Sequence, residues 1–102
     1  MNQDISPRVA GYGLAAAIAI VFNTLLAWVK DSVPALNAAM KAAMGHHWIT
    51  HGVVDVIVFV VLGMILSRSA VSHNMSGTAL AKIIFVAAVL GGGGLAVWFL
   101  FV

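Results

Sequence analysis

Three of the four histidines and one of the three acidic residues lie between His46 and Asp55. An α-helix turns by about 100° per residue, so His47, His51 and Asp55 would share one stripe while His46 points elsewhere. Histidines at i and i+4 followed by a carboxylate can bind zinc or copper. An imidazole beside a carboxylate can instead transfer protons, because histidine titrates near neutral pH. The spacing therefore predicts a metal site or a proton site on one helix face.

His46 and two methionines are possible additional ligands of this site. Met40 and Met44 extend the stripe if the helix continues through Gly45, and thioether sulfur favours Cu(I). A haem b would take His47 or His51 as one axial ligand and would need the second from another helix or subunit. A quinone beside the same polar groups is a further possibility.

The remaining interpretations need no cofactor. In the structural one, Asp55 accepts a hydrogen bond from His51, and this polar pair fixes how the helices pack. In the other, an oligomer of the chain conducts ions through a pore lined by these groups. An ionised carboxylate deep in a membrane is costly, so we expect Asp55 to point toward His51 or Asn23 in either case.

The pattern His46-His47-Trp48-Ile49 followed by Asp55 resembles the second helix of the hydrophobic anchor subunits of succinate dehydrogenase. Those subunits are also short chains with three spans. In that family a histidine near the helix start binds haem b, and a later aspartate–tyrosine pair adjoins the quinone. Here the aspartate comes earlier and Val56 stands where the tyrosine would follow, so we transfer no residue role.

Composition indicates the surroundings in which these groups lie. Of the 102 residues, 63% are hydrophobic and 8% are charged, and the mean hydropathy is +1.09. Soluble domains have about a quarter of their residues charged, so lipid must surround much of this chain. The formal charge of +2 comes without a basic cluster, which gives nucleic-acid binding no support. The lack of cysteine excludes disulfides and thiolate ligands within the chain.

Three apolar segments are long enough to cross a bilayer, which takes about 20 helical residues. We therefore expect an all-α integral membrane protein with a single transmembrane domain. The expected spans cover about residues 9–29, 48–66 and 79–102.

A short interfacial amphipathic helix is expected before the second span, because apolar residues recur at four-residue spacing over about residues 33–45. Ser32 can cap its start, Pro34 suits its first turn and Gly45 can end it. One continuous helix over 33–66 is the alternative, since a single glycine costs only about 1 kcal/mol.

Aromatic residues support the three-span topology. The end of the first span, the start of the second and the end of the third would lie at one interface, and Trp28, Trp48 and Trp98 occupy these places. Indole rings prefer the headgroup level, so the three form an interface belt. Tyr12 falls near the opposite interface.

Basic residues predict the orientation. Arg8, Arg68 and Lys82 lie on the N-terminal side of the spans, against Lys30 and Lys41 on the other side. The positive-inside rule then favours a cytoplasmic N-terminus and an external C-terminus in the cell inner membrane.

Small residues mark helix surfaces that can pack closely in lipid. Asn23 lies within one such series and is expected to bond to a neighbouring helix. The run from Gly91 to Gly94 predicts a kink, or close contact with another chain or a flat cofactor. The expected packing residues are Gly11, Ala15, Ala19, Asn23 and Ala27 on the first span, and Ala88, Gly92 and Ala96 on the third.

Together these features predict a small subunit or anchor, without catalytic activity of its own, in a larger or homo-oligomeric membrane complex. Its His/Asp site would lie next to a haem, metal (copper or zinc) or quinone of that complex. The expected partners are the lipid bilayer and other membrane subunits or further copies of the chain. The alternative is a homo-oligomeric transporter or channel for protons or metal ions.

Overall fold

The structure, a computed structural model, describes residues 5–101, with the side chain of Val71 left out. It is all-α, as expected, and three of its helices are long and apolar enough to span a membrane. Residue 102, at the end of the expected third span, lies outside the described residues. The helices are α1 (Pro7–Ser32), α2 (Pro34–Met44), α3 (His47–Leu66), α4 (Ala70–His73) and α5 (Gly77–Phe101).

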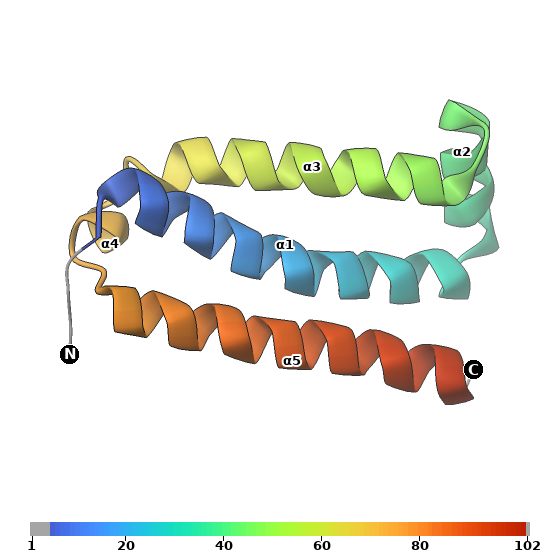
Figure 1. Cartoon of the computed structure of the whole chain (residues 1–102). Coiled ribbons are helices and arrows are strands. Elements are labelled where there is room, and N and C mark those ends of the chain that lie inside the picture. The colour runs from blue at the N-terminus through green and yellow to red at the C-terminus, as the bar shows by residue number, and fades with distance from the viewer. Residues whose placement is uncertain (1–4, 102) are drawn as a thin grey trace.

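The three long helices lie side by side in a single layer, with α1 between α3 and α5 (Figure 1). The principal extents are 45 × 28 × 15 Å. The smallest of these is close to the diameter of one helix with its side chains, about 10–12 Å. α3 and α5 contact each other little, so this is an open layer in which both faces of α1 lie near the surface.

The turn from α1 to α2 follows from a proline. Pro34 disfavours the helical conformation in the residue before it, and Val33 is accordingly extended, with φ −118° and ψ 98°. The expected cap at Ser32 is wrong, because α1 continues through this residue. Val33 takes the N-cap position of α2 without a side-chain hydrogen bond.

The chain breaks again at Gly45, which leaves two helices over 33–66 instead of one. Gly45 has φ 84°, a left-handed conformation that a glycine adopts without steric cost. His46 then caps α3, since its Nδ1 accepts a hydrogen bond from the backbone N–H of Trp48 at 3.1 Å. α2 consequently lies across the end of the layer (Figure 1).

Small residues let α1 approach α3 closely. A Cβ on Gly11 would overlap the backbone of Ser67, and one on Gly63 would overlap the ring of Tyr12. The Tyr12 ring also lies 5.6 Å from that of Phe59, centroid to centroid. Backbone proximity and ring packing thus hold this end of the two helices together.

Polar side chains of α1 bond to the glycine-rich part of α5. Thr24 Oγ1 donates to the carbonyl oxygen of Gly91 at 2.7 Å, and Trp28 Nε1 donates to that of Gly94 at 3.3 Å. α5 is one continuous helix through the four glycines, because backbone groups in lipid must be satisfied within the helix. Gly91 and Gly94 therefore allow close contact with α1, and none of the four glycines ends the helix.

Candidate functional site

His51 is the centre of a buried polar cluster between α1 and α3. Only 1% of its surface is exposed. Its Nδ1 lies 3.0 Å from Lys30 Nζ, and its Nε2 lies 2.7 Å from Asn23 Oδ1. Asn23 and Lys30 are two helical turns apart on α1, so both present their side chains to the same ring.

The hydrogen bonds determine how the His51 ring is protonated. A lysine ammonium can only donate, so Nδ1 must accept from Lys30. Nε2 then carries the ring hydrogen and donates to Asn23 Oδ1. Asp55 Oδ2 lies 3.5 Å from the same Nε2. The carboxylate points toward His51, as expected, but Asn23 accepts the shorter hydrogen bond.

Lys30 is the residue of this cluster that sequence reasoning missed. It was expected among the interfacial charges, yet it has no exposed surface. Its ammonium lies 3.3 Å from the centroid of the Trp48 ring, a cation–π contact, in addition to the bond to His51. Its spacing of seven residues from Asn23 was the available signal, because residues at i and i+7 share a helix face.

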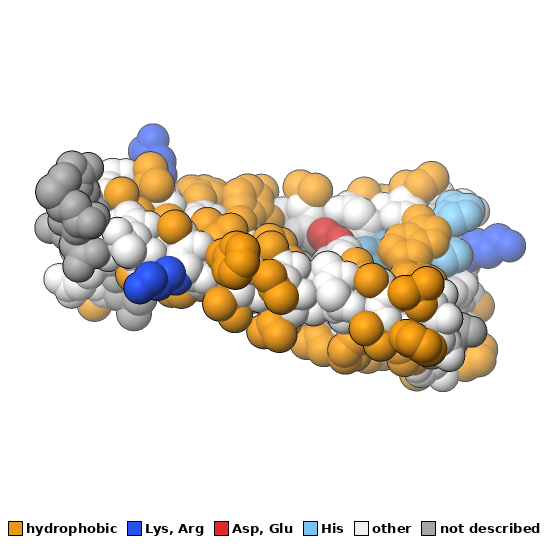
Figure 2. Space-filling view, turned by 60° about the horizontal axis from the view of Figure 1, so that its bottom comes forward, with side chains coloured by type: hydrophobic (Ala, Val, Ile, Leu, Met, Phe, Trp, Pro, Cys, Tyr) orange, Lys and Arg blue, Asp and Glu red, His pale blue; other side chains and the backbone are white. Residues whose placement is uncertain are grey.

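Asp55 borders a hollow on one face of the layer. Its side chain is 22% exposed, and its Oδ1 is buried without a hydrogen-bond partner. Figure 2 shows an acidic side chain within a largely hydrophobic and uncharged surface, with histidine beside it. The hollow has a volume of about 460 Å³ and is lined by residues of α1, α3 and α5. They include Ala19, Asn23, Thr24, Asp55, Ala88, Gly91 and Gly92.

The packing residues expected on the third span lie on this open side. Ala88 and Gly92 line the hollow, and Ala96 is exposed. A Cβ on Gly92 would meet no atom within 4 Å. By contrast, the series on α1 packs inside the chain, where Gly11, Ala15 and Ala27 are buried and Ala19 and Asn23 are half-buried.

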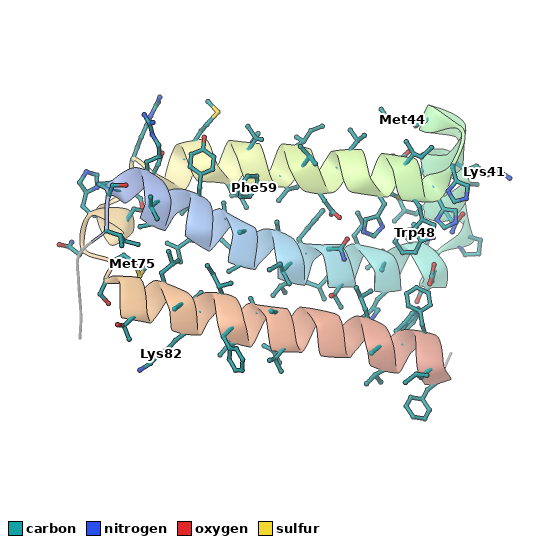
Figure 3. The ribbon with its side chains drawn as sticks, viewed as in Figure 1. Lys41, Met44, Trp48, Phe59, Met75 and Lys82 are labelled. Atoms are coloured by element: carbon teal, nitrogen blue, oxygen red, sulfur yellow. The ribbon has the colours of Figure 1, made fainter. Side chains whose placement is uncertain are left out.

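The other predicted ligands do not join His51. The His46 ring stacks on that of His47 at 4.8 Å between centroids, and His47 Nδ1 is buried without a partner. Met40 is buried, and its carbonyl accepts a hydrogen bond from Thr50. Met44 is exposed at the end of α2 (Figure 3). The break at Gly45 turns α2 away, so the methionines cannot continue the stripe of α3.

This geometry gives the metal hypothesis no support. Within residues 5–101, no three side chains of His, Asp or Glu are placed to hold a metal ion. Both ring nitrogens of His51 are already engaged, one by the lysine ammonium. The contacts instead join the Lys30 ammonium to the His51 ring, which donates to Asn23 and lies 3.5 Å from the Asp55 carboxylate.

The three tryptophans lie at the end of the layer where this cluster is found. The rings of Trp28 and Trp98 are 5.9 Å apart, and that of Trp48 is 6.3 Å from Phe99. Trp98 Nε1 also donates to Asp31 Oδ2 at 3.0 Å. The three indoles therefore lie at the same end of the layer, and their position at a membrane interface stays a prediction.

Comparison with protein families, with curated proteins and with solved structures finds no match for this chain. These comparisons therefore do not extend the short resemblance to the anchor subunits of succinate dehydrogenase. The contacts of the His51 cluster and the open face beside it are therefore the basis on which a function can be inferred.

Proposed function

We propose that this chain is a small, non-catalytic subunit of a membrane complex, and that other transmembrane helices bind to the face that carries Asp55. One observation carries the proposal. The buried Oδ1 of Asp55 has no hydrogen-bond partner, although it belongs to a helix long and apolar enough to span a membrane.

The depth of Asp55 along its helix makes an unsatisfied carboxylate costly. Asp55 follows the start of α3 by two helical turns, which is about 12 Å at 1.5 Å per residue. A carboxylate in the hydrocarbon costs about 3 kcal/mol or more unless protein or water surrounds it. Among residues 5–101, the ion-pair partner of the carboxylate is His51, whose Nε2 lies 3.5 Å from Oδ2. A donor from another polypeptide would satisfy the remaining oxygen.

The shape of the layer provides room for such a helix. α3 and α5 are separated across α1, and the hollow between them is bordered by Ala88 and Gly92. Small residues let a second backbone approach closely, which is how helices associate where no hydrophobic force acts between them. The partner helix would carry a lysine, arginine, hydroxyl or amide side chain at the depth of Asp55.

Purification from native membranes in mild detergent tests this proposal. We expect the wild-type chain to elute with a stoichiometric partner or with further copies of itself. Asp55→Asn keeps the shape but removes the charge, and should lower partner retention by at least about tenfold, since hydrogen bonds to charged groups contribute about 1.5–3 kcal/mol. Asp31→Asn is the control, because Asp31 is exposed at the helix end. A wild-type chain that is monomeric in native lipid nanodiscs would refute the proposal.

A second candidate is a homo-oligomeric proton channel or transporter. It is favoured by the proximity of three titratable side chains, Lys30, His51 and Asp55, which extend from the tryptophan end into the layer. Proteoliposomes containing the chain alone should then dissipate a pH gradient, and Asp55→Asn should abolish the leak. The geometry does not comparably support transport of metal ions. It also gives no comparable support for a haem, metal or quinone beside the site.

A further inference from the structure

A second groove lies between α1 and α5, on the other side of their contact from the Asp55 hollow. Its volume is about 680 Å³. The lining is apolar on both helices apart from one lysine at its edge. The lining residues are Ala17, Ile18, Val21, Phe22 and Leu25 of α1, and Lys82, Ile83, Val86, Ala87 and Leu90 of α5.

Lys82 differs from Lys30 in being exposed at the helix surface. Within residues 5–101, no acidic side chain forms an ion pair with it. Figure 3 shows it extending from the part of α5 that lies nearest α4. Arg8 and Arg68 border another depression at that end of the layer. The groove is thus apolar along its length and positively charged at one end.

We propose that this groove binds an acyl chain of an anionic phospholipid whose phosphate contacts Lys82. The occupant has to be apolar over most of its length and anionic where it reaches the headgroup level, which describes such a lipid. A long lysine side chain can place its ammonium among the headgroups while its stem lies in hydrocarbon. From Lys82 to Leu90 the groove extends over about 12 Å, at 1.5 Å per residue.

Native mass spectrometry of the full chain with phosphatidylglycerol and with phosphatidylcholine tests the site. Wild-type protein should retain one phosphatidylglycerol preferentially. Lys82→Gln should reduce that retention about fivefold, as expected for about 1 kcal/mol per basic residue near an anionic lipid. Lys82→Arg should keep it. Lys41→Gln, at the exposed lysine of α2, should leave it unchanged.

A second variant tests the groove itself. Val86→Trp fills the groove from an exposed position of α5 and should reduce retention as much as Lys82→Gln does. Circular dichroism confirms that each variant keeps its helices. Equal retention by Lys82→Gln and wild type would overturn the site, as would equal losses in Lys82→Gln and Lys41→Gln. Loss in Lys82→Gln but none in Val86→Trp would show headgroup binding alone and would overturn the acyl-chain site.

Discussion

Lys30 connects two helices through one ammonium group. It donates to His51 of α3 and lies over the ring of Trp48 in the same helix, while its own backbone belongs to α1. A buried ammonium without such partners would be strongly unfavourable in lipid. Lys30 is therefore part of the cluster together with the His/Asp pair.

Lys30→Met should destabilise the α1–α3 contact, because methionine keeps the length of the side chain but cannot donate to His51. We expect the free energy of unfolding to fall by about 1–3 kcal/mol, the cost of leaving a buried polar group unsatisfied. Circular dichroism during denaturation in detergent measures it.

Lys41→Met is the matched control, because Lys41 projects away from the helices at the end of α2 (Figure 3). Its effect should stay within about 0.5 kcal/mol, as for other exposed substitutions. Equal stabilities for the two variants would show that the Lys30 contacts contribute nothing to the fold.

At the scale of the elements, glycines determine how closely helices can approach. Gly11 and Gly52 are both glycines within long apolar helices, but their surroundings in the structure differ. The place of a Cβ on Gly11 is taken by the backbone of Ser67, whereas a Cβ on Gly52 would meet no atom within 4 Å. This difference depends entirely on which helix lies opposite.

Gly11→Ala should therefore separate α1 from the end of α3. A backbone cannot rotate away as a side chain does, so we expect a loss of about 1–3 kcal/mol, typical of overpacking. Gly52→Ala should be neutral or stabilising by up to about 1 kcal/mol, because alanine has the higher helix propensity. Thermal unfolding of both variants under identical detergent conditions compares them, and a stable Gly11→Ala variant would contradict the close approach.

At the scale of the whole molecule, the open layer is what suggests a partner. A layer one helix thick leaves α3 and α5 with little buried surface of their own. In lipid an apolar helix can remain in that state, because acyl chains replace the missing protein contacts. Acyl chains cannot donate a hydrogen bond to the Asp55 carboxylate, which borders the hollow.

Gly92→Leu and Gly93→Leu distinguish the two sides of α5. Neither glycine has a neighbour within 4 Å of a built Cβ, so both variants should fold as stably as wild type. Only Gly92 lines the Asp55 hollow. We expect Gly92→Leu to lower partner retention by about tenfold or more, because the leucine side chain would overpack the interface with the partner helix. Gly93→Leu should leave partner retention unchanged. Equal retention in pull-downs of both variants would place the interface elsewhere.

The predicted orientation can be tested because the natural chain contains no cysteine. Single cysteines at Ala43 in α2 and Ala70 in α4 occupy exposed positions at opposite ends of the layer. With a cytoplasmic N-terminus, a membrane-impermeant maleimide added to intact cells should label Ala43→Cys and not Ala70→Cys. The reverse labelling pattern would show that the positive-inside argument fails here.

The sequence by itself determined the local features of this protein. Hydropathy and length predicted the three membrane-spanning helices, and periodicity together with Pro34 and Gly45 predicted the short helix between the first two. Tryptophan spacing predicted which helix ends lie together. All of these features depend on the types of neighbouring residues and on their preference for lipid or water. Both can be read directly from one sequence.

Only the tertiary structure decided which faces meet. α5 is apolar over almost its whole length, so no polar face indicates how it is rotated about its axis. The His47, His51 and Asp55 stripe gives α3 a polar face but does not specify which residues of α1 lie against it. The rotation of these helices places Lys30 against His51 and leaves Asp55 at the edge of an open hollow. It follows from close backbone contacts at glycines such as Gly11 and Gly91, since packing drives helix association in lipid where hydrophobicity does not.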